Sequence, residues 1–390
     1  MQRAGRMRRR RFISLLGGAA LTPLSALSAS ANAPDGCGIP TVRDDGWPVA
    51  SVDDDKLIDR TALCKVADRL AASANVHALL IARGGRLVFE RYFRGDDEIN
   101  DRPVANASFD ADTLHNMKSV SKSVACLALG IAIDRGLIRG VDEPIFSFFP
   151  ELSDLRSPEK DRLRLSHALT MSMGLKWVEA TPSTGNDNND EARMHMAPDP
   201  CRYVLGLPVT ASAGQEFFYN TGALTLVSAI VRKAVGRPLD EFVRETLFAP
   251  LGITAFEWSR VKGDSDAGGG LRLRPRDMVK IGQLVLAGGR WNCRQIVSKA
   301  WIDASTTPRL EATGPYFYGY LWWLGRSLHE GHEVHWTAAL GRGGQSIRIV
   351  PELDLVVAVT AGYYQDYSPR AFQVQSGLFK DVLRGIPASG

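Results

Sequence analysis

Segments with the pattern of β-strands lie towards both ends of this chain, whereas its middle has the pattern of helices. Near the N-terminus, residues 77–81 and 86–93 surround an Arg-Gly-Gly turn, which predicts a hairpin. Near the C-terminus, apolar runs predict strands at 335–337, 346–350 and 355–360. This order indicates an α/β (α+β) fold, in which one antiparallel sheet contains both chain ends, is flanked by helices and carries a helical insertion.

Helical spacing of apolar residues predicts the elements between and beside these strands. The expected helices are residues 56–72, 119–136, 165–173, 223–235, 239–247, 275–287, 298–305 and 373–384. Residues 142–151, which contain two prolines, and the polar residues 179–200 are expected to be loops. No linker interrupts residues 32–390, so we expect a single domain with a mainly helical insertion at about 141–270.

The first 31 residues have the pattern of a signal peptide. Arginines at 8–11 precede an apolar run, and small residues follow with Ala-x-Ala spacing. Paired arginines at this position are typical of twin-arginine export, and we expect cleavage after Ala31 because Pro34 would hinder cleavage after Ala33. The alternative is an uncleaved membrane anchor, although the apolar run is short for a spanning helix. The sequence therefore predicts a periplasmic or secreted protein.

Removal of this leader changes the charge of the chain. Six arginines leave and no acidic residue does, so the formal net charge of +4 becomes about −2. The mature chain gives no electrostatic reason to expect a nucleic-acid partner. No second segment has the length and apolarity of a membrane span, so we expect no stable membrane insertion after cleavage. The oligomeric state is not predicted.

The five cysteines bear on the redox state of the protein. They are Cys37, Cys64, Cys126, Cys201 and Cys293. An odd number leaves at least one thiol unpaired or paired between chains. Cys126 lies within an apolar helical segment, so a buried free thiol is expected there. One or two disulfides are expected among the other four, with a connectivity that the sequence does not decide.

Ser119-Val-Ser-Lys122 opens an apolar segment that runs to Ile138. On a helix, a hydroxyl and an amine three residues apart share one face. A serine is a poor nucleophile until a nearby group takes its proton, and Lys122 could do so if it is held neutral. The positive end of the helix dipole would disfavour a charged lysine and would favour an oxyanion beside Ser119. The alternative is a helix-capping serine next to a solvated lysine.

Two later motifs could complete such a site. Tyr219 and Asn220 stand where a loop meets a helix, and they could supply a phenol and an amide. Their alternative roles are a tyrosine at the edge of the core and a helix cap. Residues 341–345, Gly-Arg-Gly-Gly-Gln, lead into a strand, and a backbone N–H there could form an oxyanion hole with the amide of Ser119. The alternative is a hairpin turn that needs positive φ.

Other kinds of site find little support. His329, His332 and His335 do not have the HExxH spacing, and a strand would point the last two to opposite faces, so no metal site is expected. The chain has no Gly-x-Ser-x-Gly nucleophile elbow, which argues against an α/β-hydrolase triad. No cofactor is expected.

The three motifs occur in the order found in the class C β-lactamase-related serine hydrolases, and the chain resembles the 6-aminohexanoate-dimer hydrolase and esterase branch of that family. Further similar stretches are residues 169–177, 268–271, 276–277, 318–323 and 343–351. The resemblance extends from about residue 53 to the C-terminus. It implies a β-lactamase/DD-peptidase-like fold and a serine nucleophile, but it does not specify the substrate.

The resemblance also implies roles for individual residues. Ser119 would be acylated, Lys122 would lower the barrier to its deprotonation, and Tyr219 would transfer protons to the leaving group. Asn220 would contact the substrate or Lys122. The N–H groups of Ser119 and Arg342 would form the oxyanion hole.

Four further residues are expected to bind substrate. Gly341 matches the last glycine of the family's strand motif, and Gly343 follows it. Trp177 and Trp323 could line the acyl pocket, with packing in the core as the alternative.

Two departures from the family pattern affect these roles. Tyr219 and Asn220 are adjacent, whereas the family usually has one residue between them, so counting back from Asn220 would select Phe218, which cannot transfer a proton. Ala339 and Leu340 replace the Lys or His of the strand motif, and Arg342 is the remaining candidate cation. That replacement argues against efficient hydrolysis of β-lactams.

These observations predict an exported serine hydrolase that cleaves an ester or amide bond of a small substrate through an acyl-enzyme on Ser119. The first alternative is a β-lactamase or peptidoglycan DD-peptidase. The second is a catalytically silent binding protein on the same scaffold.

Overall fold

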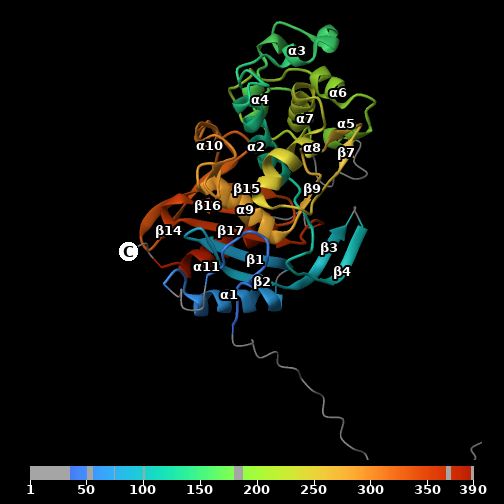
Figure 1. The fold of residues 1–390 in the computed structure, drawn as a ribbon. Coiled ribbons are helices and arrows are strands. Elements are labelled where there is room, and N and C mark those ends of the chain that lie inside the picture. Colours follow the sequence, from blue (N-terminus) through green and yellow to red (C-terminus); the bar gives the residue numbers. More distant parts are fainter. Residues whose placement is uncertain are drawn as a thin grey trace, which may run out of the picture. The chain divides into compact units, whose positions relative to one another are not determined.

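An eight-stranded antiparallel sheet brings the two ends of the chain together (Figure 1). The strands, in their order across the sheet, are β12 (Leu310–Glu311), β13 (Phe317–Tyr318), β14 (Trp323–His329), β15 (His332–Gly341), β16 (Gln345–Val350), β17 (Leu355–Ala361), β1 (Val76–Arg83) and β2 (Arg86–Tyr92). β17 and β1 pair antiparallel, with Leu79 opposite Val359. This confirms the sheet predicted from the sequence.

The computed structural model describes residues 36–50, 56–73, 75–99, 102–179, 188–365 and 370–387. The predicted signal peptide lies outside these residues. Within the described part of the chain, no helix has the length and apolarity that a bilayer crossing requires. Residues from Cys37 onwards form one compact unit.

Helices cover both faces of the sheet. Leu79 and Ile81 of β1 pack in one apolar cluster with residues of α1 (Arg60–Ser73) and α11 (Arg370–Arg384). Leu80 and Ala82 point the other way and pack with α2 (Val120–Asp134) and α9 (Pro275–Leu286). This alternation follows from the two-residue period of a strand. Because both faces are covered, β1 and β17 are buried along their whole length.

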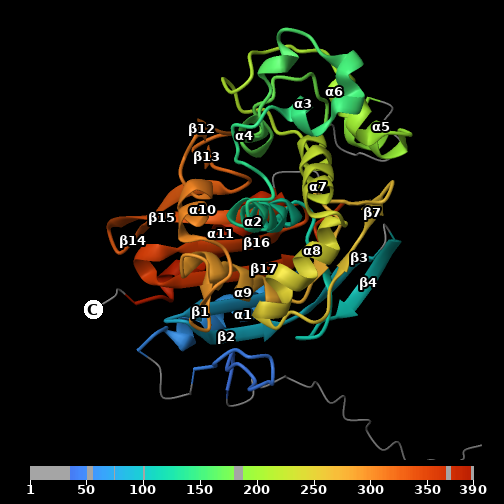
Figure 2. The ribbon, with the colours of Figure 1, turned by 45° about the horizontal axis from the view of Figure 1, so that its top comes forward.

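Helix α2 lies at the centre of the protein. Figure 2 shows it nearly end-on, surrounded by α7, α8, α10 and the sheet. Every residue from Val120 to Ala132 is buried, and a helix that is apolar all round belongs in a core. A Cβ at Gly130 would lie 2.1 Å from the ring of Trp301, so this glycine allows α10 (Lys299–Ser305) to approach.

A cluster of shorter helices follows α2 in the sequence. It contains α3 (Ile145–Phe148), α4 (Leu165–Leu169), α5 (Asp190–Met196), α6 (Pro200–Gly206), α7 (Gly222–Val235) and α8 (Leu239–Val243). A π-helical turn, Arg244–Phe248, continues α8. Short 3₁₀ helices occur at Pro150–Leu155, Lys160–Arg162, Ala249–Leu251 and Pro351–Leu353. The expected domain boundaries at 141–270 stay a prediction.

Small sheets complete the fold. They are β3 (Arg94–Ile99) with β4 (Arg102–Ser108), β5 (His115–Asn116) with β9 (Leu271–Leu273) and β6 (Glu257–Trp258), β7 (Arg260–Val261) with β8 (Asp264–Ser265), and β10 (Arg290–Trp291) with β11 (Arg294–Gln295). β5 ends three residues before Ser119, the predicted nucleophile, and so helps to position it.

Two of the expected loops contain helices. Residues 142–151 were expected to be irregular, but Ile145 and Phe146 are buried in the short helix α3. Residues 179–200 include α5, whose N-terminus is capped because the Asn189 side chain accepts a 2.9 Å hydrogen bond from the N–H of Ala192. Tertiary burial therefore overrode the two prolines on which the first prediction rested, and a helix cap overrode the polar composition on which the second rested.

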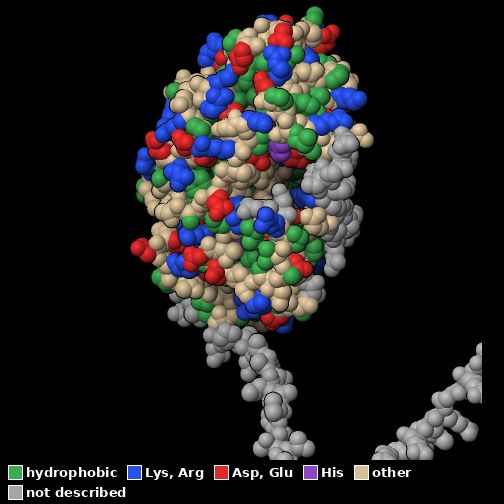
Figure 3. All heavy atoms as spheres, turned by 90° about the vertical axis from the view of Figure 1, so that its right-hand side faces the viewer, with side chains coloured by type: hydrophobic (Ala, Val, Ile, Leu, Met, Phe, Trp, Pro, Cys, Tyr) green, Lys and Arg blue, Asp and Glu red, His purple; other side chains and the backbone are tan. Residues whose placement is uncertain are grey.

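The surface is hollowed between the helical cluster and the part that carries the sheet. Figure 3 shows this hollow on the side that α5 and the β3–β4 hairpin share in Figure 1. Acidic and basic side chains and a histidine lie at its described rim.

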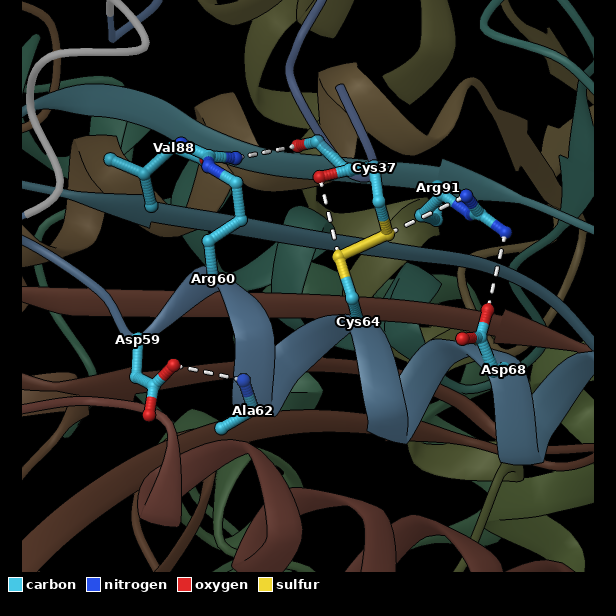
Figure 4. The surroundings of a disulfide bond; sticks show 9 residues. Cys37, Asp59, Arg60, Ala62, Cys64, Asp68, Val88 and Arg91 are labelled. Atoms are coloured by element: carbon cyan, nitrogen blue, oxygen red, sulfur yellow. Dashed lines mark hydrogen bonds and ion pairs between the residues drawn. A yellow bond between two sulfur atoms is a disulfide. The ribbon is translucent and has the colours of Figure 1, made fainter. Parts of the chain in front are cut away.

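A disulfide joins Cys37 to Cys64 of α1 (Figure 4). It ties the N-terminal segment of this compact unit to α1, the helix that covers the sheet. Beside it, Arg60 donates to the backbone oxygen of Val88 at 3.2 Å, and Arg91 lies 3.8 Å from Asp68. Cys126 and Cys201 are buried free thiols and Cys293 is exposed, which confirms the free thiol predicted at 126.

The Cys37–Cys64 disulfide should contribute measurably to stability. It closes a loop with a sequence separation of 27 residues, for which chain entropy gives about 3.5 kcal/mol. We expect the double substitution Cys37→Ser and Cys64→Ser to lower the free energy of unfolding in urea by about that amount. Cys293→Ser, at the exposed free thiol, is the control and should unfold like the parent. An unchanged unfolding midpoint in the double variant would contradict the prediction.

Candidate active site

Ser119 stands immediately before the first residue of α2. Its side chain is half-buried and makes no capping hydrogen bond to the helix. Lys118, the preceding residue, has φ of +46°, a left-handed conformation that is uncommon for a residue other than glycine. This sharp bend and the missing cap leave the Ser119 hydroxyl available for other partners. The alternative of a helix-capping serine is therefore wrong.

The principal partner of Ser119 is the amine of Lys122. Lys122 Nζ lies 2.9 Å from Ser119 Oγ and donates to the backbone oxygen of Gly268 at 2.6 Å. The side chain is almost entirely inside the protein, with 2% of its surface exposed. The solvated lysine of the alternative interpretation is thus also excluded.

Tyr219 completes the group around Ser119. The amine of Lys122 lies 5.1 Å from the centroid of the Tyr219 ring, and Ser119 and Lys122 both lower the pKa of the Tyr219 hydroxyl. Phe218, the alternative from counting residues, is 55% exposed and has no hydroxyl. The structure therefore selects Tyr219 as the phenol of the site.

The pKa values of Lys122 and Tyr219 are linked. Burial lowers the pKa of Lys122, but the charges of Tyr219, Glu179 and Glu191 raise it more, so it lies above its ordinary value of 10.5. Burial raises the pKa of Tyr219 above 10.0, although the nearby amine opposes the shift. Because each group changes the pKa of the other, they titrate as a pair, and a neutral Lys122 during catalysis stays a prediction.

Two glutamates that the sequence analysis missed lie near this pair. Glu179 accepts hydrogen bonds from Trp177 Nε1 at 2.9 Å and from the N–H and hydroxyl of Thr221 at 2.9 and 2.7 Å. It therefore anchors the segment that carries Tyr219. Glu191 of α5 is close enough to act electrostatically on Lys122, and burial raises the pKa of its carboxyl. Nothing in their sequence context distinguished them from other polar residues.

The loop 266–270 positions the acceptor for Lys122. Asp266 Oδ1 receives the N–H groups of Gly268 and Gly269 at 3.0 and 3.2 Å, which turns the Gly268 carbonyl towards the amine. Residues 268–271 were identified from the sequence as a stretch similar to the family. A contact made by a backbone carbonyl does not depend on the side chain, so the sequence did not reveal that Gly268 contacts Lys122.

The end of β15 lies against the segment before Ser119. A Cβ at Gly341 would be 2.3 Å from the backbone oxygen of Met117, so only a glycine permits this approach. Gly343 has φ of +86°, and a Cβ there would be 2.5 Å from the ring of Tyr364. The Arg342 guanidinium donates to the Tyr364 carbonyl at 2.9 and 2.7 Å. These contacts place the backbone of Arg342 beside the segment that leads to Ser119. A role for the Arg342 N–H in the oxyanion hole stays a prediction.

The remaining predicted residues differ in position. Trp323 stacks on Tyr219, with ring centroids 6.1 Å apart, and so borders the site. Trp177 is buried at 2% exposure and faces Glu179, which favours a packing role. Asn220 Oδ1 accepts the N–H of Ala223 at 3.2 Å, as a cap of α7. The structure brings Ser119, Lys122, Tyr219 and Trp323 together, but it gives Asn220 no contact with Lys122.

Two elements that interact with the site border the hollow seen in Figure 3. Glu191 of α5 acts electrostatically on Lys122, and Lys118, the residue before Ser119, pairs with Glu98 of β3 at 3.1 Å.

The sequence and the fold of this chain are similar to those of known proteins. A family model described as Beta-lactamase covers residues 66–371, which is well over half of the chain. The chain belongs to the beta-lactamase family. It is 23% identical to the 6-aminohexanoate-dimer hydrolase of Paenarthrobacter ureafaciens over 341 residues, covering 80% of this chain and 79% of that protein. It is 26% identical to Esterase EstB of Burkholderia gladioli over 181 residues, covering 45% and 44%.

Solved structures show the same fold. A Bacillus anthracis protein provisionally named 6-aminohexanoate-dimer hydrolase superposes with a TM-score of 0.68 at 21% identity, covering 90% of this chain and 88% of that one. EstCE1, a hydrolase with promiscuous acyltransferase activity, superposes with a TM-score of 0.65 at 13% identity, covering 84% and 100%. These likenesses confirm the β-lactamase/penicillin-binding-protein-like fold.

Tyr219→Phe tests the phenol. Removal of the hydroxyl takes away the group that bridges Ser119 and Lys122 without changing the ring that stacks on Trp323. We expect kcat for a p-nitrophenyl ester to fall about 10²- to 10⁴-fold with little change in stability. Phe218→Leu, at the exposed neighbour, should keep the parent kcat. A Tyr219→Phe variant with parent kcat would assign proton transfer to another group.

Gly341→Ala tests the contact between β15 and the nucleophile's segment. The added methyl group collides with the Met117 carbonyl, so the end of β15 must shift relative to Ser119. A displacement of about 1 Å is expected to lower kcat by roughly 10- to 100-fold. Gly377→Ala is the matched control, because a Cβ there meets nothing within 4 Å. Equal kcat values for the two variants would show that the close approach at Gly341 is not needed.

Proposed function

We propose that the protein is an exported serine hydrolase that cleaves an ester or amide bond of a small substrate through an acyl-enzyme on Ser119. The observation that carries the proposal is the 2.9 Å contact between Lys122 Nζ and Ser119 Oγ, beside the Tyr219 phenol. A buried amine at this distance from a serine hydroxyl meets the geometric requirement for activating a nucleophile.

Formation of the acyl-enzyme needs a base that can take the Ser119 proton. The amine of Lys122 lowers the pKa of Tyr219 relative to burial alone, so it favours the phenolate form of Tyr219. In the proposed step this phenolate, formed by loss of the phenol proton to solvent, accepts the proton of Ser119 as the hydroxyl oxygen bonds to the substrate carbonyl carbon. Because the two groups interact strongly, they titrate as a unit.

Charge that develops on the substrate carbonyl also needs stabilisation. In the proposed geometry the carbonyl oxygen turns towards the N–H groups of Ser119 and Arg342. The first lies at the N-terminus of α2, where the helix dipole favours negative charge. One such donor is worth about 3 kcal/mol of transition-state stabilisation. Tyr219 then returns its proton to the leaving group, and water releases the acyl group by the reverse path.

The substrate class rests on the relatives and on the strand motif. Among the relatives are a 6-aminohexanoate-dimer hydrolase and an esterase, which supports ester or amide substrates rather than one bond type. Ala339 and Leu340 supply no cation to a substrate carboxylate, and the Arg342 guanidinium is engaged with the Tyr364 carbonyl. These features favour the hydrolase over a β-lactamase or DD-peptidase.

Export is supported by two independent features. The first is the N-terminal pattern of arginines, an apolar run and Ala-x-Ala. The second is the disulfide between Cys37 and Cys64, which is a bond typical of oxidising compartments such as the periplasm.

Ser119→Ala is the decisive variant. We expect hydrolysis of a short p-nitrophenyl ester to fall at least about 10⁴-fold with the fold intact. In the parent, a fluorophosphonate probe should label Ser119, as mapped by mass spectrometry. The Ser121→Ala variant should still be labelled at Ser119.

The same assays distinguish the alternatives. Rapid nitrocefin turnover without ester hydrolysis would favour the β-lactamase. Folded parent protein that is neither labelled at Ser119 nor active on any ester, amide or amino-acid oligomer would support a silent binding protein and end the proposal.

A further inference from the structure

Three buried side chains from separate strands converge near the start of the nucleophile's segment. They are His77 of β1, Asp97 of β3 and His115 of β5, and at most 7% of the surface of each is exposed. One potential ligand atom from each lies within 4.8 Å of the other two. Two histidines and a carboxylate form a donor set typical of zinc and related metal ions.

The polar atoms of this cluster lack partners in the described protein. His77 Nδ1, Asp97 Oδ1 and both ring nitrogens of His115 are buried without a hydrogen bond. Buried polar atoms are almost always satisfied by protein, water or an ion. Four such atoms in one place therefore indicate a ligand that binds all three side chains.

The hydrogen bond of His77 Nε2 determines which nitrogen of this ring can bind a metal ion. His77 Nε2 lies 2.8 Å from the backbone oxygen of Asp96. A carbonyl oxygen can only accept, so Nε2 carries the proton and Nδ1 presents a lone pair to the cluster. A ligating histidine usually donates its second N–H to a carbonyl or carboxylate in this way.

An aromatic side chain packs against both rings. Phe109 stacks on His77 with centroids 3.8 Å apart and lies 4.9 Å from His115.

Neighbouring cations do not block a metal ion, because both are paired. Arg272 acts electrostatically on Asp97 and His115, and Lys118 acts on Asp97. The Arg272 guanidinium pairs with Glu257 at 2.5 Å and donates to the Leu114 carbonyl. Lys118 pairs with Glu98 at 3.1 Å.

We propose that His77, Asp97 and His115 bind one divalent transition-metal ion of the zinc type, which joins β1, β3 and β5 behind the active site. Ligands at about 2.0–2.1 Å from a tetrahedral ion are roughly 3.4 Å from one another, so small side-chain rotations bring the present atoms into range.

The position of the site gives the ion a structural role. His115 pairs with Leu273 of β9, close to the loop whose Gly268 carbonyl holds Lys122. Asn116, Met117 and Lys118 then connect it to Ser119. A metal at His115 therefore anchors β5, which leads to Ser119, and β9, which follows the loop that carries the Gly268 carbonyl. It makes no contact with the substrate, so its ligands are positioning residues.

The proposal can be tested on protein produced without a histidine tag. The purified protein is stripped with dipicolinic acid, reloaded with Co²⁺ or Zn²⁺, and dialysed. We expect one metal ion per chain, visible d–d absorption of tetrahedral Co²⁺ and its loss when Zn²⁺ is added. Thermal unfolding should move upward by roughly 4 °C at a Zn²⁺ concentration 100 times the Kd.

Matched variants localise the ion. His115→Gln and Asp97→Asn should bind less than a tenth of the parent's Co²⁺ and lose the thermal shift. His332→Gln, on the exposed end of β15, should bind like the parent. Ester hydrolysis by metal-free protein should fall several-fold in kcat, whereas fluorophosphonate should still label Ser119.

Two results would overturn the proposal. Stripped and reloaded parent protein with no d–d absorption and no thermal shift would show that the cluster binds no metal. Parent-like binding by either ligand variant would place the ion elsewhere. If His115→Gln does not fold, the Co²⁺ spectrum of the parent and of Asp97→Asn decides the question.

Discussion

The buried amine of Lys122 is the contact on which the arrangement of the site depends. An ammonium inside a protein must be surrounded by acceptors, because an unpaired buried charge is strongly destabilising. Its partners come from different parts of the chain: Ser119 at the start of α2, Gly268 in the loop before β9, and Tyr219 before α7. Satisfying this one group therefore fixes the helical cluster, the small sheet and the central helix relative to one another.

Much of the fold was predictable where local patterns were strong. The sequence predicted β1, β17, α2 and α9 correctly. Burial on all sides leaves a continuous run of apolar residues in β1, β17 and α2, whereas α9 shows apolar residues at helical spacing. β14 was missed because its apolar residues are interrupted by Gly325, Arg326 and Ser327. The β3–β4 hairpin was also missed, since its strands are polar and largely exposed.

The candidate site was predictable only in part. Ser119, Lys122 and Tyr219 carry spacing that survives in the sequence, and the structure brings them together. The Gly268 carbonyl, the charges that raise the pKa of Lys122 and the cluster of His77, Asp97 and His115 depend on contacts between distant segments. Those three metal-ligand candidates have no regular spacing, so the sequence led us to expect no metal.

The stacking of Trp323 on Tyr219 gives the site an optical property. The two rings are inclined by 20° with their centroids 6.1 Å apart, so the indole is a near neighbour of the phenol. A bound acyl group would change the polarity around the indole. Fluorescence from Trp323, isolated by replacing the other tryptophans, would therefore follow each turnover without a chromogenic substrate.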